Sequence, residues 1–361
     1  MKEKVNKFGE KAFFAAVNSG YGFYSFYDTV FKNEEISRRY IIKGGPGTGK
    51  SRFMREAAIY SASLGYSVEY YYCSSDPTSL DGIIAEDMNG RRICIIDGTA
   101  PHACEIEKVG IRDEIIDLGA FLDRKKMVSR RAEVESLMHA KDIAYSKAYE
   151  ALRSALEITK TSSNEAHGRI KKEKLDNASQ RILRGVDASD VYFERVGVLS
   201  SFGMFGEYSF DTYVSLADDI IIVDNSLGIA DAYLSSLLSH LRRFGISSYR
   251  SYDRQDPSKL DALYIPSMSL SVISDVSGIC TSNEKCRKRI NMQRFIDHDA
   301  LKYIKNDMRS SEKAIKELMA KGEREMDKVR SLHFLLESIY VDAMDFSSKE
   351  EFSEKWREEN L

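Results

Sequence analysis

The sequence predicts an α/β fold built twice in tandem, and three observations support this prediction. Short apolar runs rich in strand-forming residues, such as 67–73 and 92–97, alternate with helical periodicity over 51–64. Sequence similarity recurs 180 residues further along the chain. Two long stretches with helical apolar spacing, about 123–185 and 297–361, each close one copy. We therefore expect two domains, residues 1–185 and 186–361.

The repeat is clearest after the first helical stretch of each copy. Asp76-Pro77 and Leu80-Asp81 align with Asp256-Pro257 and Leu260-Asp261, and Gly65 aligns with Gly245. A polar capping signal in each long stretch, residues 162–165 and 347–350, indicates a break between two helices. Each copy is thus expected to be a parallel sheet with an appended helical hairpin.

Composition is that of an ordinary soluble protein. Charged residues make up 30% of the 361 residues and hydrophobic residues 43%, and the net charge of -3 gives no signal for nucleic acid. No stretch has the length and apolar character of a membrane-spanning helix. Five cysteines, an odd number, suit a reduced compartment better than a disulfide framework. We expect a cytoplasmic protein.

The first copy opens with a strand over residues 40–43 that leads into a glycine-rich loop. The loop has the spacing G-x-x-x-x-G-K-S of a phosphate-binding loop, which predicts a P-loop NTPase-like sheet. In such a loop the backbone N–H groups and the start of the following helix hold phosphate. The expected nucleotide-binding residues are Gly45, Pro46, Gly47, Thr48, Gly49, Lys50, Ser51 and Arg52.

We expect distinct roles in nucleotide and metal binding for three polar side chains, those of Lys50, Ser51 and Asp97. Lys50 is expected to reach the β- and γ-phosphates, and the Ser51 hydroxyl to bind Mg²⁺. Asp97 ends the strand 92–97, where a Mg²⁺-associated carboxylate belongs, so it is a second expected metal ligand and a catalytic residue.

Two further residues are weaker candidates. Asp76 follows the strand 67–73 and could orient an attacking water, but Asp256 persists in the copy without the loop, which favours a structural turn. His102 follows Asp97 and lies in a loop, where a lone His more often serves as a surface residue.

The second copy lacks the phosphate-binding loop. Residues 224–231 stand in its place, with Ala230 where the first copy has Lys50 and Asp231 where it has Ser51. A carboxylate there would repel a triphosphate, so we expect one nucleotide site per chain. We expect the nucleotide to be ATP rather than GTP, since the sequence has no Asn-Lys-x-Asp stretch of the kind that recognises guanine.

Three motifs together resemble those of a family of bacterial tandem-repeat P-loop ATPases. They are the loop 44–51, Cys73 to Asp81 in the pattern C-x-x-D-P-x-S-L-D, and Asp97 to His102 in the pattern D-x-T-A-P-H. The resemblance covers nearly the whole chain and implies ATP binding with hydrolysis. The degenerate second loop departs from the pattern, which argues against a mechanism that needs two hydrolytic sites.

The leading hypothesis is a Mg²⁺-dependent ATPase whose second half is a pseudo-NTPase. The first alternative is a small-molecule or nucleotide kinase, because no acid follows Asp97 and a helical hairpin can close as a lid. The second alternative is a non-hydrolytic, nucleotide-switched module that binds a partner through its long helices. The sequence does not identify the small-molecule or protein partner, and an oligomer is compatible with it.

Overall fold

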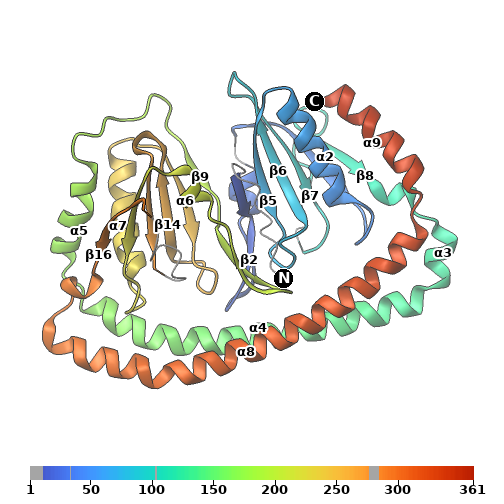
Figure 1. Cartoon of the computed structure of the whole chain (residues 1–361). Coiled ribbons are helices and arrows are strands. Elements are labelled where there is room, and N and C mark those ends of the chain that lie inside the picture. Colours follow the sequence, from blue (N-terminus) through green and yellow to red (C-terminus); the bar gives the residue numbers. More distant parts are fainter. Residues whose placement is uncertain (1–10, 33, 102–103, 276–283) are drawn as a thin grey trace.

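The fold is described from a computed structural model covering residues 11–32, 34–101, 104–275 and 284–361. Figure 1 shows two α/β halves side by side above a pair of long helices. The elements of the first half are β1 (Lys11–Phe14), β2 (Ala16–Ser19), β3 (Gly22–Ser25), α1 (Tyr27–Phe31), β4 (Ile36–Lys43), α2 (Lys50–Ser63), β5 (Ser67–Tyr72), β6 (Leu80–Glu86), β7 (Arg92–Asp97), β8 (Asp113–Asp117), η1 (Leu118–Phe121), α3 (Arg124–Ser129), α4 (Arg131–Gly168), α5 (Lys172–Gln180) and η2 (Arg181–Leu183).

The second half repeats this order. Its elements are β9 (Glu194–Val196), β10 (Ser200–Gly203), β11 (Gly206–Ser209), α6 (Thr212–Leu216), β12 (Asp219–Val223), α7 (Ala230–Arg243), β13 (Ser248–Tyr252), β14 (Leu260–Ile265), η3 (Pro266–Met268), β15 (Leu270–Ser274), β16 (Cys286–Ile290), η4 (Met292–Phe295), α8 (His298–Ala343) and α9 (Phe346–Asn360).

The two six-stranded sheets have the same topology. The first has the order β1-β5-β6-β7-β4-β8, and the second has the corresponding order β9-β13-β14-β15-β12-β16. A small hairpin, β2-β3 in one half and β10-β11 in the other, accompanies each sheet. The α/β class and the repetition of two similar halves are thus as the sequence predicts.

The sheets are mixed, which corrects the prediction of parallel sheets. In the first sheet, β6 runs antiparallel to both β5 and β7, and β14 does the same in the second. The connections on either side of β6 are only a few residues long. A parallel pairing needs a crossover of a dozen or more residues, so these connections can only form hairpins.

The strand β4 and the helix α2 follow from their apolar patterns. Tyr40, Ile41 and Ile42 of β4 are buried between parallel neighbours on both sides, β7 and β8. On α2 the buried side chains recur at helical spacing and cover the sheet, at Phe53, Met54, Ala57, Ala58 and Ser61.

The two halves meet in a shared hydrophobic cluster, and the second sheet with α7 has a further cluster of its own. Phe14 and Val198 occupy corresponding positions and exchange two backbone hydrogen bonds, with N–O distances of 2.8 and 3.2 Å. Phe13 contacts the rings of Tyr213 and Tyr249 of the second half. Cys73, Cys94, Cys104 and Cys286 form no disulfide, and Cys280 lies outside the described residues.

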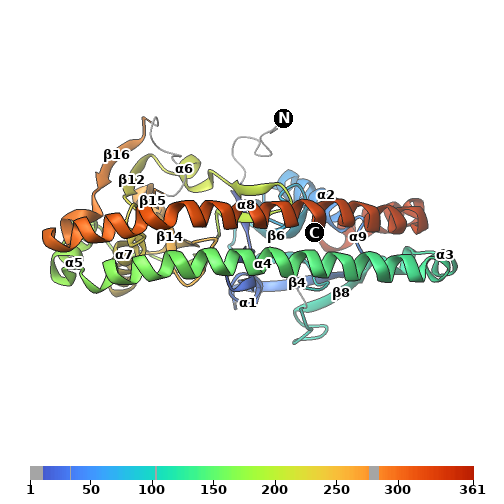
Figure 2. The ribbon, with the colours of Figure 1, turned by 90° about the horizontal axis from the view of Figure 1, so that it is seen from below.

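The long helices are exchanged between the halves. Helices α4 and α8 run antiparallel and side by side beneath both sheets (Figures 1 and 2). As a result α5, from the first half, packs on α7 of the second, and α9, from the second half, packs on α2 of the first. Backbone bridges between Leu122 and Met344 and between Ile170 and Ile296 fix the two ends of the helix pair.

This exchange corrects the predicted helical hairpins. The two long helices pair with one another rather than with the short helix that follows each of them. The proposed capping signal at 162–165 lies inside α4, and α9 is capped by Asp345, whose carboxylate accepts from the N–H of Ser348 at 3.1 Å. Apolar spacing predicts a helix but does not identify its partner. None of the described helices is long and apolar enough to cross a membrane.

Candidate functional site

The glycine loop, defined as residues 44–51, connects the end of β4 to the start of α2. Gly47 and Gly49 have φ values of +74° and +82°, in the left-handed region that glycine adopts without strain. Gly49 is also the N-cap residue of α2. The glycines at these positions therefore permit the backbone to turn directly into the helix.

The backbone N–H groups of this loop are available to an anion. Within the described part of the chain, the amides of Gly45, Gly47, Thr48, Gly49 and Lys50 have no backbone hydrogen-bond acceptor. The loop is stabilised instead by the Thr48 hydroxyl, whose Oγ1 donates to the Gly45 carbonyl at 2.9 Å. Unsatisfied N–H groups at a helix start, together with the helix dipole, form an anion site.

Lys50 lies over the loop and connects it to Asp97. Its Nζ donates to the carbonyls of Gly44 and Gly45 at 2.9 and 2.8 Å and lies 3.5 Å from Asp97 Oδ2. Both side chains are only 12% exposed. Burial raises the pKa of Asp97, and the positive charge of Lys50 opposes that rise.

Ser51 and Asp97 each keep donor atoms suited to Mg²⁺. The Ser51 Oγ accepts a hydrogen bond from Leu80 N at 2.9 Å, which leaves a further lone pair. Asp97 Oδ1 accepts from Thr99, whereas Oδ2 faces Lys50. Among the described residues, no three His, Cys, Asp or Glu side chains gather as a metal site. Mg²⁺ commonly takes only one or two protein oxygens and completes its shell with phosphate and water.

Asp76 and Arg52 have structural partners. Asp76 Oδ1 accepts from the N–H and the hydroxyl of Thr78 at 2.9 and 2.6 Å, and Asp256 makes the corresponding turn with Ser258. This is the turn expected from the repeat. Arg52 is exposed and donates to Glu56 on its own helix at 2.8 Å. His102 lies outside the described residues.

The last turns of α8 lie directly on the glycine loop. A Cβ built on Gly45 would fall 2.2 Å from the ring of Tyr340, and one built on Gly47 would fall 2.8 Å from the carbonyl oxygen of Glu337. A side chain at Gly45 would require the Tyr340 ring to move, and one at Gly47 would require the α8 backbone to move. The absence of side chains thus serves a second purpose here, the close approach of α8.

Helix α9 adds a buried lysine beside the start of α2. Lys349 is fully buried, and its Nζ lies 3.6 Å from where a Cβ on Gly49 would be. Its nearest charge partner is Glu350 Oε1 at 3.5 Å, and Nζ has no hydrogen-bond acceptor in the described structure. Sequence reasoning missed the α8 and α9 residues because a helical stripe carries no information about which distant loop it covers.

Titratable groups of both halves gather on the side of the loop that faces α8. Burial raises the pKa of Glu337, with Asp76 adding to the rise and Lys50 opposing it. Burial lowers the pKa of His333, and Lys141 of α4 lowers it further. These long helices therefore bring ionisable side chains into the field of Lys50 and Asp76.

The corresponding loop of the second half is filled by its own side chains. Asn225 Oδ1 accepts from the N–H of Ala230 at 3.0 Å, the amide equivalent to that of Lys50. Asp231 pairs instead with His167 of α4, Oδ1 to Nε2, at 3.0 Å. The amide oxygen of Asn225 thus takes the place that an anion would have.

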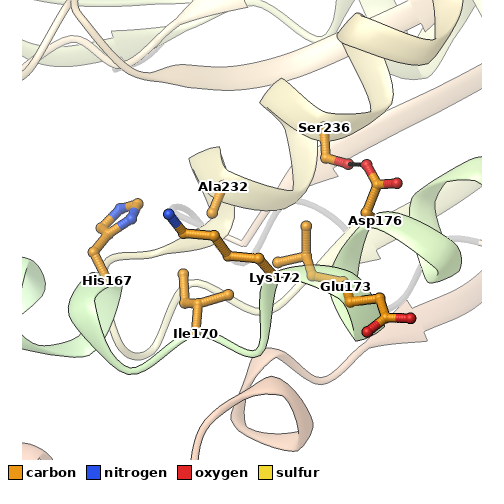
Figure 3. Close-up of a pocket in the computed structure, with 8 residues that line it drawn as sticks. His167, Ile170, Lys172, Glu173, Asp176, Ala232 and Ser236 are labelled. Carbon is orange, nitrogen blue, oxygen red and sulfur yellow. Dashed lines mark hydrogen bonds between the residues drawn. The ribbon is translucent and has the colours of Figure 1, made fainter.

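An open pocket of about 500 Å³ lies between α5 and α7 in this second half (Figure 3). Several of its polar side chains are paired with one another or with neighbouring residues, whereas Lys172 and Glu173 also line it. Asp176 accepts from Ser236 at 2.9 Å and contacts His240 Nε2 at the same distance, and His167 contacts Asp231. The pairing of Asp176 and His167 leaves Lys172 and Glu173 as the charged side chains of this pocket with no hydrogen-bond or ion-pair partner among the described residues.

Comparison of the chain with protein-family models, curated proteins and solved structures gave no significant match. The case for a function therefore depends on the geometry of the glycine loop and of the helices that cover it.

Proposed function

We propose that the first half binds MgATP in the glycine loop and hydrolyses it, and that the second half is a pseudo-NTPase. The observation that carries this proposal is the contrast between the two loops. The first leaves its N–H groups open beside Lys50, whereas the second fills the equivalent position with the Asn225 amide oxygen.

In this proposal each residue of the loop has a defined contact. The N–H groups of Gly45 and of residues 47–52 hold the α- and β-phosphates, and Lys50 exchanges its carbonyl acceptors for phosphate oxygens. Ser51 and Asp97 would hold Mg²⁺, which offsets the charge that develops on the phosphates. The salt bridge between Lys50 and Asp97 keeps both side chains near this position before a nucleotide arrives.

The nucleotide-switched module is the second candidate function. It is favoured by the contact between the loop and Tyr340, Glu337 and Lys349, because a nucleotide held there must touch or displace helices of the other half. The kinase alternative keeps the missing acid after Asp97 but loses the second feature that favoured it, since the long helices do not form a hairpin that can close as a lid.

A binding experiment with a matched pair of lysine variants tests the proposal. We expect Lys50→Ala to weaken MgATP binding by about 2 kcal/mol, or roughly 30-fold, because it removes a charge-assisted contact to phosphate. Titration calorimetry of the full chain measures the affinity. Formation of ADP without any added acceptor separates hydrolysis from phosphoryl transfer to a metabolite.

The control is Lys259→Ala in the second half. Lys259 Nζ also donates to a loop carbonyl, that of Gly228, at 3.3 Å, so the two variants remove equivalent charges from the two loops. Lys259→Ala should bind ATP like the wild type. A wild-type protein that binds no ATP, or equal affinities in the wild type and Lys50→Ala, would contradict the proposal.

A further inference from the structure

Among the described residues of the first half, the acidic candidates Asp76 and Asp97 are already engaged and are not obvious groups to activate the attacking water. Gly98 follows Asp97, so the residue after the Mg²⁺-associated acid has no carboxylate. Asp97 itself is engaged by Lys50 and Thr99, and Asp76 Oδ1 by Thr78. The search for a proton acceptor therefore turns to the helices that cover the loop.

Glu337 of α8 is an acidic residue that this exchange places against the loop. A Cβ on Gly47 would lie 3.0 Å from Glu337 Cγ, and Tyr340 and Val341, on the same face of α8, cover Gly45 and Gly47. The Glu337 carboxylate is half-buried and has no ion-pair or hydrogen-bond partner among the described residues. It is free to accept a proton.

The Glu337 carboxylate interacts electrostatically with two residues of the glycine-loop region. They are Lys50, the residue expected at the β- and γ-phosphates, and Asp76 after β5. Its pKa is raised by burial, which makes the carboxylate a stronger base than an exposed glutamate. His333, four residues earlier on α8, responds to the same two charges.

The internal symmetry provides an independent comparison. Asp123 and Asp297 precede corresponding helices, and the same alignment of α4 with α8 pairs Ser163 with Glu337. Ser163 lies on the degenerate loop as Glu337 lies on the glycine loop, with its Cβ 2.9 Å from where a Cβ on Gly228 would be. The covering carboxylate is therefore present where the loop is open and missing where the loop is filled.

We propose that Glu337, carried by the second half, is the general base of ATP hydrolysis in the first half. The inference rests on the proposed function. A water oxygen forms a bond to the γ-phosphorus while the bond from that phosphorus to the β–γ bridging oxygen breaks, which gives ADP and phosphate. The proton that the water loses goes to the Glu337 carboxylate and then to solvent.

The test is hydrolysis of MgATP by Glu337→Gln in the full chain under single-turnover conditions, with ATP affinity measured on the same protein. We expect the hydrolysis rate to fall about 100-fold or more, with ATP affinity within about threefold of wild type. Glu337→Asp, which keeps a carboxylate, should lose less than the glutamine variant. Ser163→Ala is the matched control at the equivalent position of α4 and should hydrolyse ATP at the wild-type rate.

The other outcomes overturn the assignment in distinguishable ways. If Glu337→Gln hydrolyses ATP at the wild-type rate, Glu337 is not the base and the ATPase proposal stands. If Glu337→Gln loses ATP affinity together with turnover, Glu337 has a binding or packing role instead. If the wild type binds ATP without hydrolysing it, both this assignment and the hydrolytic part of the proposed function fail, and Lys50-dependent binding remains.

Discussion

Single residues distinguish the glycine loop from its counterpart in the second half. Lys50 and Ser51 are replaced by Ala230 and Asp231, and the amide of Asn225 then bonds to the backbone at a position where the first loop has Gly45. The same contrast continues on the covering helices, with Glu337 on one side and Ser163 on the other. The two halves therefore differ both in the loop and in the helix residue that packs on it.

The raised pKa of Glu337 predicts a pH dependence of hydrolysis. A base works only when deprotonated, so turnover should rise with pH through a pKa above the ordinary value of 4.5 for glutamate. Asp76 and Lys50 face this carboxylate from the first half, and His333 lies beside it on α8.

The measurement is a profile of the single-turnover rate against pH. The fall in rate at low pH should disappear in Glu337→Gln. It should persist in His333→Gln, because in this proposal Glu337 and not His333 is the group that titrates. A fall at low pH that Glu337→Gln leaves unchanged would assign the pH dependence to another group.

The glycine loop could be predicted from the sequence, whereas the helix residues that pack on it could not. Residues 44–51 are adjacent in the chain, and their spacing alone indicates the turn from strand to helix that the structure contains. The Asx turn of Asp76 was likewise predictable from its repetition at Asp256. Glu337 and Lys349 were not, because their proximity to the loop depends on the exchange of helices.

At the scale of elements, the exchanged helix α9 completes the first half. Its Trp356 is buried against Tyr40 of β4 and Phe53 of α2, with ring centroids 4.7 and 5.0 Å apart. Arg357 donates to Glu56 of α2 at 2.8 Å. The second half thus provides part of the covering layer of the sheet that carries the glycine loop.

We expect Trp356→Ala to lower the free energy of unfolding by about 3–5 kcal/mol, because it leaves a cavity between α9 and the first sheet. Urea denaturation followed by circular dichroism measures the change. The control is Phe334→Ala on α8, which is 45% exposed and should cost less than about 0.5 kcal/mol. Equal losses in the two variants would show that α9 does not support the first half in this way.

The elements were only partly predictable. The apolar patterns that predicted β4, α2, β5 and β7 are long or strongly periodic. Strand β8 was missed because only Asp113 and Ile116 of its five residues are buried, so its pattern resembles a loop. The long helices were predicted as helices, but their pairing depends on the docking of two whole sheets.

At the scale of the whole molecule, neither half is complete alone. Helix α8, with 46 residues, is about 70 Å long and reaches from the second sheet to the glycine loop of the first. Helix α4 makes the reverse connection with 38 residues. The two halves are therefore expected to fold as one cooperative unit.

Separate expression of residues 1–185 and 186–361 tests this expectation. The isolated first half lacks α8 and α9 and should bind MgATP at least about tenfold more weakly than the full chain, since the helices that pack on its loop and sheet are missing. A mixture of the two fragments should recover the affinity, measured by calorimetry. Full affinity in the first fragment alone would contradict the expected dependence.

The exchange of helices limits how much of the second copy could be deleted without altering the first. A duplicated copy that has lost its chemistry is ordinarily free to be deleted. Here deletion of the second copy would also remove Glu337, Lys349 and Trp356 from around the surviving loop. Under the proposed function, the loop of the second copy can change while the rest of that copy is retained, because its helices form part of the nucleotide-binding half.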